Sequence, residues 1–328
     1  MIGTQTPFRI SFAGGGSDLA AFYEREPGCV LSTTIDKYMY ILVHPYFEPD
    51  KVLVKYAKTE LVDAVDDIQH PIVREALRQF DLTGVDINSI ADIPAGTGLG
   101  SSSSFTVGLL HALYAYTYRY PSKKQLASEA CHIEIDLLKE PIGKQDQYAA
   151  AFGGLNFITF DPSGDVGVEP IRLPPDKHRE LEANLCMFYL GRTRQAGDIL
   201  KHQRDRTIDG AGMDNLRRMT DLARQLRDSL TRHNLEDFGR ILDEGWRLKR
   251  QLSDRISNGV IDEHYGKAIE SGALGGKLLG AGGSGFLLFY CQQAHQERLE
   301  ASLALRRVRF RFDTEGSKVF HVGGDAIR

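Results

Sequence analysis

The sequence predicts an α+β protein with two domains. Candidate strands and helices are mixed along the chain, without the strict alternation that a doubly wound parallel sheet requires. A length of 328 residues allows two domains or one large one. Pro174-Pro175 and a charged stretch precede a new apolar segment, so we expect a domain boundary near residues 180–190, dividing the chain into 1–185 and 186–328.

Composition and charge argue against several classes of protein. The formal net charge is −4 and no basic block stands out, which argues against nucleic acid as a partner. The four cysteines show no CxxC pair or metal-ligand spacing, so we expect free thiols in a reducing compartment. The start of the chain lacks a signal-peptide pattern, and no apolar run approaches the roughly 20 residues that span a bilayer. We therefore expect a cytoplasmic protein without a membrane partner.

The first half of the chain combines strands with helices. Alternating or apolar patterns predict strands at residues 5–12, 29–36, 37–46, 51–56, 85–90 and 153–160. Helices are expected after the glycine turn at 13–18 and over 71–80, 105–118 and 122–138. Pro71 suits a first helical turn, and Ser122 is a plausible N-cap.

The second half has a different texture. We expect a buried strand at 184–190, helical structure over 211–252, a glycine-interrupted strand pair at 277–290, a helix at 293–305 and a last strand at 318–322. The Arg, Asp and Glu residues of the 211–252 region are interpreted as solvated helix surface.

The stretch from Ile93 to Ser104 organises the chain. Its three glycines alternate with small residues, and four serines then lead into an apolar segment typical of a helix. A helix start of this kind offers unpaired backbone N–H groups and partial positive charge, which favour a phosphate. No Gly-Lys-Ser/Thr follows, so the Walker pattern is absent. A flexible Gly/Ser linker is the alternative, but the apolar flanks argue against it.

A second glycine turn, Gly14-Gly15-Gly16-Ser17-Asp18, follows the first strand and its Arg9. Asp18 would be able to accept hydrogen bonds from the vicinal hydroxyls of a sugar. The alternative is that Asp18 simply caps the helix that follows.

Two acids follow the central loop. Glu134 lies in an apolar context and needs a partner, for which a cation is one candidate. Asp146 follows a Pro-Ile-Gly turn and opens the next helix. The alternative for each is an ordinary helix-terminal acid.

A third glycine-rich stretch runs from Gly275 to Phe286. So many glycines beside a strand would weaken it unless the backbone closely approaches a ligand or another loop. The alternative is a purely structural turn.

These three glycine stretches resemble, in order and spacing, those of the GHMP small-molecule kinases, which include galactokinase, homoserine kinase, mevalonate kinase and phosphomevalonate kinase. Pro94 to Ser103 matches the Pro-x-x-x-Gly-Leu-Gly-Ser-Ser signature without a gap, and Lys277 to Gly285 matches the third motif. Gly16-Ser17 stands where galactokinases carry Glu-His. That turn and Gly-Lys-Gln-Asp-Gln-Tyr at 143–148 instead resemble the D-glycero-D-manno-heptose 7-phosphate kinases.

The resemblance implies a fold and an activity. The fold would combine an N-terminal domain like ribosomal protein S5 domain 2 with a ferredoxin-like C-terminal domain, the active site lying in the cleft between them. The activity would be ATP-dependent phosphorylation of the anomeric hydroxyl of D-glycero-D-manno-heptose 7-phosphate. The 1,7-bisphosphate product would lead to GDP-heptose for capsule or surface glycans.

The resemblance also implies roles for individual residues. Asp146 would act as catalytic acid or base with Arg9 beside it, and Ser102 and Glu134 would hold Mg²⁺. The residues implied around ATP are Pro94, Gly96, Thr97, Gly98, Leu99, Gly100, Ser101, Ser102 and Ser103. Those implied on the substrate side are Gly15, Gly16, Ser17, Asp18, Gly280, Gly282 and Gly283.

A substrate that already carries a phosphate needs further positive charge. Arg192 or Arg194, after the strand at 184–190, is a hypothesis for that contact, and Lys144 is another. A solvent-facing loop is the alternative for the two arginines.

Other functions stay open. These are a GHMP kinase for a fucose-like sugar or a hexose, a non-catalytic sugar sensor on the same fold, and a dinucleotide-binding oxidoreductase. The central loop lacks the G-x-G-x-x-G spacing, which argues against the oxidoreductase. A homodimer is left open as the assembly.

Overall fold

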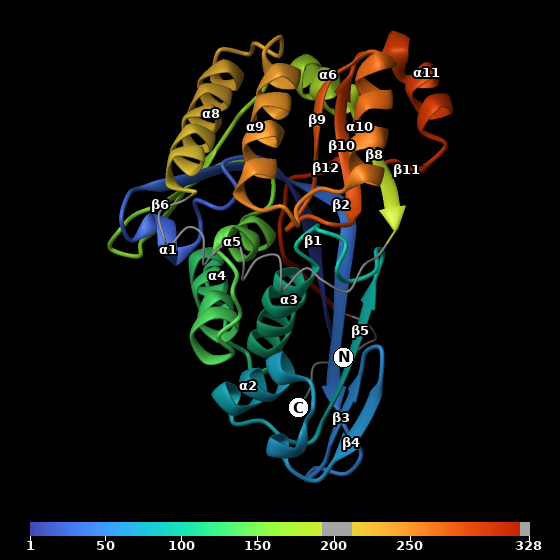
Figure 1. The fold of residues 1–328 in the computed structure, drawn as a ribbon. Coiled ribbons are helices and arrows are strands. Elements are labelled where there is room, and N and C mark those ends of the chain that lie inside the picture. The colour runs from blue at the N-terminus through green and yellow to red at the C-terminus, as the bar shows by residue number, and fades with distance from the viewer. Residues whose placement is uncertain (192–211, 322–328) are drawn as a thin grey trace.

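Two long antiparallel strands, β1 (Ile2–Ala13) and β2 (Gly28–Pro45), run through the centre of the molecule. The computed structural model describes residues 1–191 and 212–321 (Figure 1). β1 and β2 belong to a first sheet in the order β13-β1-β2-β5-β3-β4, with β6 and β12 also paired to β2 and β7 paired to β6. The other strands of this sheet are β3 (Val52–Lys55), β4 (Thr59–Val62), β5 (Val85–Ala91), β6 (Leu155–Phe160), β7 (Val166–Pro170), β12 (Phe312–Asp313) and β13 (Lys318–His321).

β2 corrects one sequence expectation. Residues 29–36 and 37–46 were expected as two strands, but they form one continuous strand. The pairing of β1 with β2 shifts register between Pro7, opposite Tyr38, and Phe8, opposite Ile35. Asp36 and Lys37 are therefore extra residues of a β-bulge, which bends the strand without ending it.

Helices cover one face of the first sheet, and α3 (Ser101–Tyr116) and α5 (Gln145–Phe152) pack directly on β1 and β2. The others in this part are α1 (Ala20–Tyr23), the 3₁₀ helix η1 (Val65–Asp67), α2 (Pro71–Phe80), α4 (Lys123–Cys131) and the π-helix η2 (His132–Leu137). α2 matches its expected bounds, and Ser122 caps α4 by accepting the Gln125 N–H at 3.1 Å, as expected. α3 begins four residues earlier than residue 105, because the serines themselves are helical.

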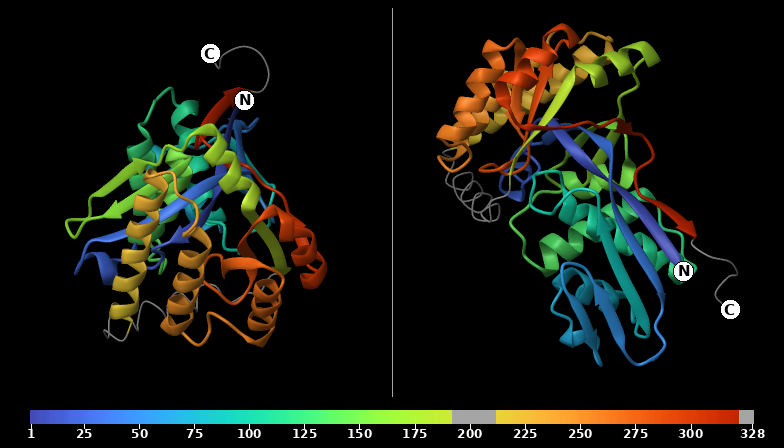
Figure 2. Two further views of the ribbon diagram at one scale, coloured as in Figure 1. Left: turned by 90° about the horizontal axis from the view of Figure 1, so that it is seen from above. Right: turned by 90° about the vertical axis from the view of Figure 1, so that its right-hand side faces the viewer.

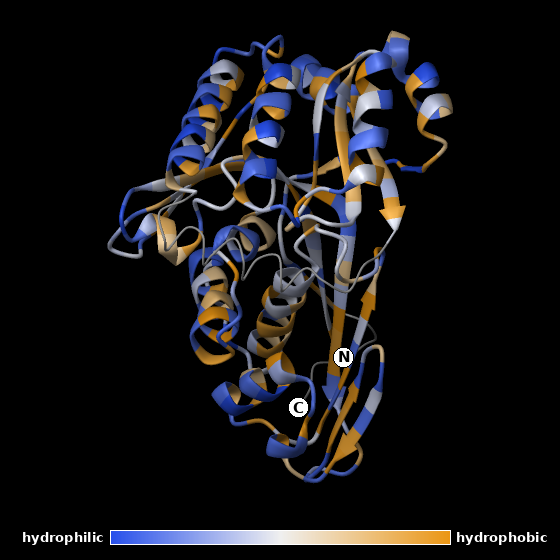
Figure 3. Cartoon of the chain, viewed as in Figure 1, coloured by the Kyte–Doolittle hydropathy of each residue, from blue (hydrophilic) through white to orange (hydrophobic). Residues whose placement is uncertain are grey.

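A second sheet has the order β11-β8-β10-β9. Its strands are β8 (Leu185–Gly191), β9 (Ala273–Leu278), β10 (Gly285–Cys291) and β11 (Arg306–Val308). The helices of this part are α6 (Pro175–Asn184), α8 (Met213–Thr231), α9 (Phe238–Leu252), α10 (Gly259–Glu270) and α11 (Gln293–Leu303). β9 and β10 confirm the expected glycine-interrupted strand pair. Hydrophobic and hydrophilic residues are interspersed along α8 and α9 (Figure 3). The buried residues recur every three or four positions, as expected of helices with one buried face.

The two sheets define two lobes (Figure 2). The larger buried cluster extends from the first sheet into the second lobe, where it includes Phe238 and Leu288, and a smaller cluster lies mostly within the second lobe. The first lobe is the first sheet with its helices, and the second lobe is the second sheet with its helices. After β11 the chain returns to the first lobe, where β12 pairs with β2 and β13 pairs with β1. The α+β class is confirmed. Within the described residues, no helix has both the length and the apolar character needed to cross a membrane.

Candidate active site

The N-terminus of α3 lies at the centre of the molecule (Figure 1). Gly100 occupies the N-cap position in a left-handed conformation, with φ 73°, and no side chain caps the helix. Pro94 and Gly96 are exposed, whereas Thr97 and Leu99 are buried and anchor the loop. The first N–H groups of a helix have no intrahelical partner, so the start of α3, at Ser101, Ser102 and Ser103, offers donors and partial positive charge to an anion.

Arg9 and Asp146 form an ion pair beside this helix start. Nε of Arg9 donates to Oδ1 of Asp146 at 2.7 Å, and Nη2 donates to Oδ2 at 2.8 Å. The Arg9 side chain is only 7% exposed, whereas that of Asp146 is 23% exposed. The arginine is therefore fixed inside the protein, while the carboxylate remains accessible to a ligand.

Arg9 also holds the central loop. Its backbone N–H donates to the Leu99 carbonyl at 3.0 Å, and Nη1 donates to the Gly98 carbonyl at 2.6 Å. A Cβ at Gly100 would lie 3.2 Å from both Arg9 Cγ and Asp146 Oδ2. Two distant sequence motifs thus meet at one point, which brings the helix start and the ion pair together.

Asp18 lies next to this group and is almost fully buried. Its Oδ1 accepts the Gly16 N–H at 2.9 Å and its Oδ2 accepts the Gln145 N–H at 3.3 Å. No side chain caps α1, so the capping alternative for Asp18 is wrong. Burial raises the pKa of Asp18, the nearby Asp146 carboxylate raises it further, and the two amides oppose the shift.

Several expected substrate residues have other partners. The hydroxyl of Ser17 is fully buried and bonds to the backbone of Gly14 and Cys29, so its expected contact with substrate is not supported. The ammonium of Lys144 donates to the Gly164 carbonyl at 3.0 Å and lies 4.6 Å from the centre of the Tyr23 ring. Arg192 and Arg194 lie outside the described residues.

Glu134 is buried behind the α3 start. It lies on η2, accepts a hydrogen bond from Ser102 Oγ at 2.9 Å, and accepts another from Gln147 Nε2 at 2.7 Å. Burial raises the pKa of Glu134, while these hydrogen bonds lower it. Within the described chain, no basic side chain pairs with this carboxylate, and Oε1 of Gln147 is buried without a partner. A hydroxyl beside a buried, unpaired carboxylate fits Mg²⁺, which favours oxygen ligands.

The third glycine loop packs against the central loop. A Cβ at Gly98 would lie 2.5 Å from the Leu279 carbonyl oxygen, and one at Gly280 would lie 2.3 Å from the Cα of Gly98. Since real Cβ atoms do not approach so closely, both positions need glycine. Gly282 and Gly283 sit on Ile256 instead, whose carbonyl accepts the Gly283 N–H at 2.9 Å. The close approach expected of this stretch is therefore an approach to another loop.

Two buried lysines support these loops. Lys249 donates to the carbonyls of Leu278, at 3.3 Å, and Gly280. Lys277 donates to the Phe12 carbonyl at 2.9 Å. Burial, followed by repulsion from Arg9, lowers the pKa of Lys249 to about 7. Burial also lowers the pKa of Lys277, together with repulsion from Lys249 and Arg9.

Neither lysine was assigned a role from sequence. The available signal was Lys249 itself, which stands among Leu242, Trp246 and Leu252 on the buried side of α9. A lysine at such a position needs acceptors inside the protein.

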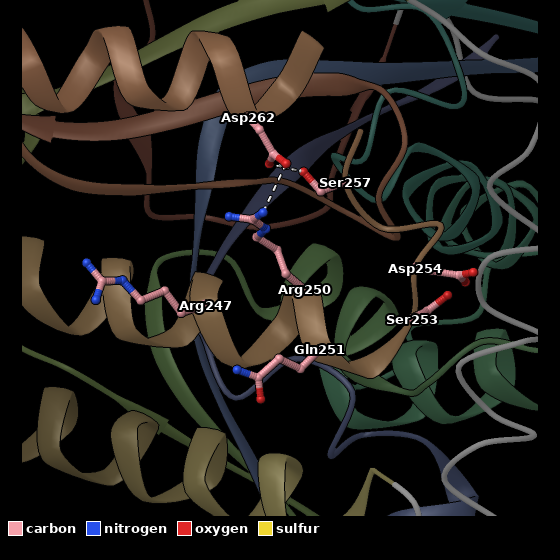
Figure 4. Close-up of a pocket in the computed structure, with 7 residues that line it drawn as sticks. All are labelled: Arg247, Arg250, Gln251, Ser253, Asp254, Ser257 and Asp262. Atoms are coloured by element: carbon pink, nitrogen blue, oxygen red, sulfur yellow. Dashed lines mark hydrogen bonds and ion pairs between the residues drawn. The ribbon is translucent and has the colours of Figure 1, made fainter. Parts of the chain in front are cut away.

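A cavity of about 530 Å³ lies beside the C-terminal end of α9 (Figure 4). Its wall contains Asp262, which accepts hydrogen bonds from Arg250 at 2.9 Å and from Ser257 at 2.6 Å. The wall continues through residues 253–257, the segment that carries Ile256 under the third glycine loop. The cavity therefore adjoins the second-lobe side of the site.

Comparison with known proteins gives matches across the whole chain. Residues 68–154 match the model of the GHMP kinases N terminal domain, and residues 226–314 match that of the GHMP kinases C terminal domain. The D-glycero-alpha-D-manno-heptose 7-phosphate kinase of Campylobacter jejuni is 30% identical, with 98% of this chain and 99% of that protein aligned.

Solved structures agree in fold. A D-glycero-D-manno-heptose 1-phosphate kinase from Bacteriodes thetaiotaomicron superposes with a TM-score of 0.81 at 22% identity, covering 99% of this chain and 100% of that chain. A putative sugar kinase from Campylobacter jejuni gives a TM-score of 0.75 at 25% identity, covering 98% of each chain. With these matches, and with the three glycine loops meeting around the Arg9–Asp146 pair, the chain belongs to the GHMP kinase family of ATP-dependent phosphotransferases.

Proposed function

We propose that this kinase phosphorylates the anomeric hydroxyl of D-glycero-D-manno-heptose 7-phosphate, giving the 1,7-bisphosphate for GDP-heptose and capsule or surface glycan synthesis. The accessible Asp146 carboxylate, held by Arg9 beside the uncapped start of α3, is the observation that carries a kinase activity. The full-length similarity to a heptose 7-phosphate kinase supports the choice of sugar.

The nucleotide phosphates would lie at the start of α3. Backbone N–H groups from Gly96 to Ser103 would bind their oxygens, and the helix start would offset part of their charge. Gly280 supports this loop from the second lobe, because its backbone touches Gly98. Phosphoryl transfer depends mostly on positioning and on electrostatic stabilisation, both of which rigid loops supply.

Asp146 would orient the anomeric hydroxyl and accept its proton. Arg9 donates a hydrogen bond to each carboxylate oxygen, which fixes the orientation of the carboxylate beside the start of α3. Arg9 would also offset negative charge that develops during transfer. Asp18 would accept hydrogen bonds from sugar hydroxyls, with Gly15 and Gly16 leaving room for the ring.

Ser102 and Glu134 would hold Mg²⁺, which would neutralise charge on the ATP phosphates. Replacing Glu134 by Gln should raise the Mg²⁺ concentration for half-maximal activity about 10-fold or more, because the anionic ligand is lost. Melting temperature should change little, since the amide keeps the shape and relieves a buried charge. Activity titrated with MgCl₂, beside thermal melting, measures both. A large loss of stability at unchanged Mg²⁺ dependence would identify Glu134 as a structural acid.

A distal phosphate would need a cationic partner, for which we propose Arg192 or Arg194, with Lys144 as the further candidate. Alanine at the contributing position should raise KM for the phosphorylated sugar about 10-fold or more, with KM for ATP nearly unchanged. Arg240→Ala, which removes an exposed arginine paired with Asp237, is the matched control. Equal changes in both KM values for every variant would reject this assignment.

A panel of sugars tests the substrate directly. Heptose 7-phosphate, free heptose, fucose, galactose and mannose would be supplied with ATP and Mg²⁺, and ADP release would be followed. The highest kcat/KM is expected for the phosphorylated heptose. A preference for fucose or a hexose would favour the other kinase activity, and no turnover with binding intact would favour a sugar sensor.

Domain division, location and assembly are further proposals. We propose an N-terminal domain of residues 1–185 and a C-terminal domain of residues 186–328, with β12 and β13 returning to the first sheet.

We propose that the protein is located in the cytoplasm. The four cysteines are buried and are not in disulfides, which suits that reducing compartment. A homodimer is proposed as the assembly, and light scattering coupled to gel filtration measures it.

A further inference from the structure

A second cavity, of about 500 Å³, lies at the outer edge of the second sheet. Its wall contains four arginines: Arg179 on α6, Arg307 on β11, and Arg309 and Arg311 on the chain that leads to β12. None of the lining residues belongs to the three glycine loops or to the Arg9–Asp146 group. A cavity of this volume accommodates a small ligand.

The sequence pattern explains how the arginines gather. Residues 306–312 read Arg-Arg-Val-Arg-Phe-Arg-Phe, and extended backbone sends alternate side chains to opposite faces. Arg307, Arg309 and Arg311 recur at this spacing and line the cavity together with Val308 and Phe310, and Arg179 reaches the same cavity from α6.

Three of these arginines have no side-chain partner among residues 1–191 and 212–321. Arginines on the surface helices are paired with carboxylates, as Arg218 is with Glu244 and Arg224 is with Asp221. By contrast, no described residue gives the side chains of Arg179, Arg309 or Arg311 a hydrogen bond, an ion pair or a ring contact. Their charge is thus free to act on a ligand.

Arg307 is held in position from within the protein. Its side chain is 13% exposed, and Nη2 donates to Gln296 Oε1 at 2.7 Å. Gln296 in turn donates to the carbonyls of Ala183 and Cys291 at 2.7 and 2.9 Å. Arg307 also forms a weak ion pair with Glu300, at 3.4 Å. One guanidinium is therefore fixed before any ligand arrives, which lowers the entropy cost of binding.

Two carboxylates line the cavity as well, but both are engaged by other groups. Asp36 accepts the Arg311 backbone N–H at 2.9 Å and pairs with Lys37 at 3.0 Å, and Glu182 accepts the Phe312 N–H. The lining therefore retains an excess of positive charge. Helix α11 starts at the rim with Gln293, and no side chain caps it, which adds partial positive charge.

Protection of a sheet edge does not account for this arrangement. β11 is the edge strand of the second sheet, and charged residues on edge strands prevent unwanted pairing. That role covers Arg306 and Arg307, which lie on β11. Arg309 and Arg311 lie beyond the end of the strand, and Arg179 lies on a helix.

We propose that this cavity is a second anion site, separate from the kinase cleft, which binds a small metabolite carrying one or more phosphoryl groups. Planar guanidinium groups suit phosphate oxygens, and several of them together favour a multiply charged ligand.

The test uses inorganic pyrophosphate as the probe, titrated calorimetrically into the full-length protein. The kinase cleft is first saturated with a non-hydrolysable ATP analogue and Mg²⁺, with Mg²⁺ matched in both solutions. The unmodified protein should bind one equivalent, and the affinity should fall as salt is raised. Arg309→Gln combined with Arg311→Gln should weaken binding about 10-fold or more. Arg306→Gln, on the preceding strand β11 but outside the cavity wall, is the matched control and should bind normally.

The titration distinguishes binding in this cavity from binding at the start of α3 and from no binding. Equal binding by the double variant, or no binding at millimolar pyrophosphate, would overturn the proposal. Binding that disappears only when the ATP analogue is present would place pyrophosphate at α3 and would also overturn it. Tighter binding of ADP than of pyrophosphate under the same conditions, lost in the double variant, would support the proposal and identify a nucleotide as ligand. Kinase activity should remain intact in the double variant, as a check on folding.

Discussion

Replacing Asp146 by Asn should reduce kcat by about 10²- to 10⁴-fold, the usual contribution of a general base. The amide keeps the size of the side chain but has no basic oxygen for the proton of the sugar hydroxyl. ATP affinity should stay within a few-fold of normal, because the start of α3 and the Arg9 bond to Gly98 remain. Steady-state kinetics and nucleotide titration measure the two quantities separately.

The matched control is Asp136→Asn, which removes an exposed acid of η2 whose only described ion pair is with His132. That variant should keep normal kcat. A modest fall in melting temperature is expected for Asp146→Asn alone, because Arg9 is largely buried and loses its partner. Near-normal turnover by Asp146→Asn would exclude Asp146 as the base and with it the proposed mechanism.

Replacing Lys249 by Met should lower kcat/KM for ATP about 10-fold or more. The ammonium holds the carbonyls of Leu278 and Gly280, and Gly280 supports the central loop by touching Gly98. Loss of this donor leaves two carbonyls without a partner and frees the loop that faces the phosphates. KM for ATP should therefore rise more than kcat falls.

The pH dependence gives a second measurement for Lys249. With a pKa of about 7 in the folded protein, Lys249 loses its charge as pH rises through neutrality, so KM for ATP should rise between pH 7 and 9. Arg9 and Lys277, which face Lys249, are the other cations involved. Phosphate binding should favour the protonated form, and calorimetry in two buffers of different ionisation enthalpy should show proton uptake near pH 7.

Raising the pH should weaken ATP binding but should stabilise the folded protein. Because the unfolded chain keeps the ordinary lysine pKa of 10.5, it binds more protons than the folded protein between pH 7 and that value. The free energy of unfolding contributed by Lys249 should therefore increase with pH over this window. Lys249→Met should abolish both trends, whereas Lys267→Met, at an exposed position on α10, should preserve them. Identical pH profiles for Lys249→Met and the unmodified protein would contradict the role.

Local signals in the sequence predicted much of the first lobe. α2 runs from Pro71 to Phe80 as predicted, because proline favours a first helical turn and the apolar periodicity ends at Phe80. Ser122 caps α4, also as predicted. The three glycine loops were found because glycines at a close backbone approach leave a recognisable pattern. Asp146 and Glu134 were singled out from their sequence context, but that context fits ordinary helix-terminal acids equally well, and only the family resemblance implied roles for them.

What the sequence did not reveal depends on contacts between distant segments. Lys277 bonds to Phe12 because the two lobes place β9 and β1 together. Arg309 gathers with Arg179 because α6 and the chain after β11 line one cavity. Ser17 was assigned to the substrate from its place in a motif, but its hydroxyl is used by the backbone of Cys29. The bulge at Asp36 could not be predicted for the same reason. β2 remains one strand because it pairs with β1 on both sides of the bulge, and that pairing is not visible in the local sequence.

The return of the chain from the second lobe to the first affects how the protein can be divided. Residues 2–5 of β1 have β13 as a neighbour, and β2 is paired with β12 at Thr34 and Ile35. A fragment ending at residue 185 would lack both neighbours and would expose unpaired strand edges, which promote aggregation. An isolated first lobe would have to be made by excising the second lobe and joining β7 to β12 through a linker.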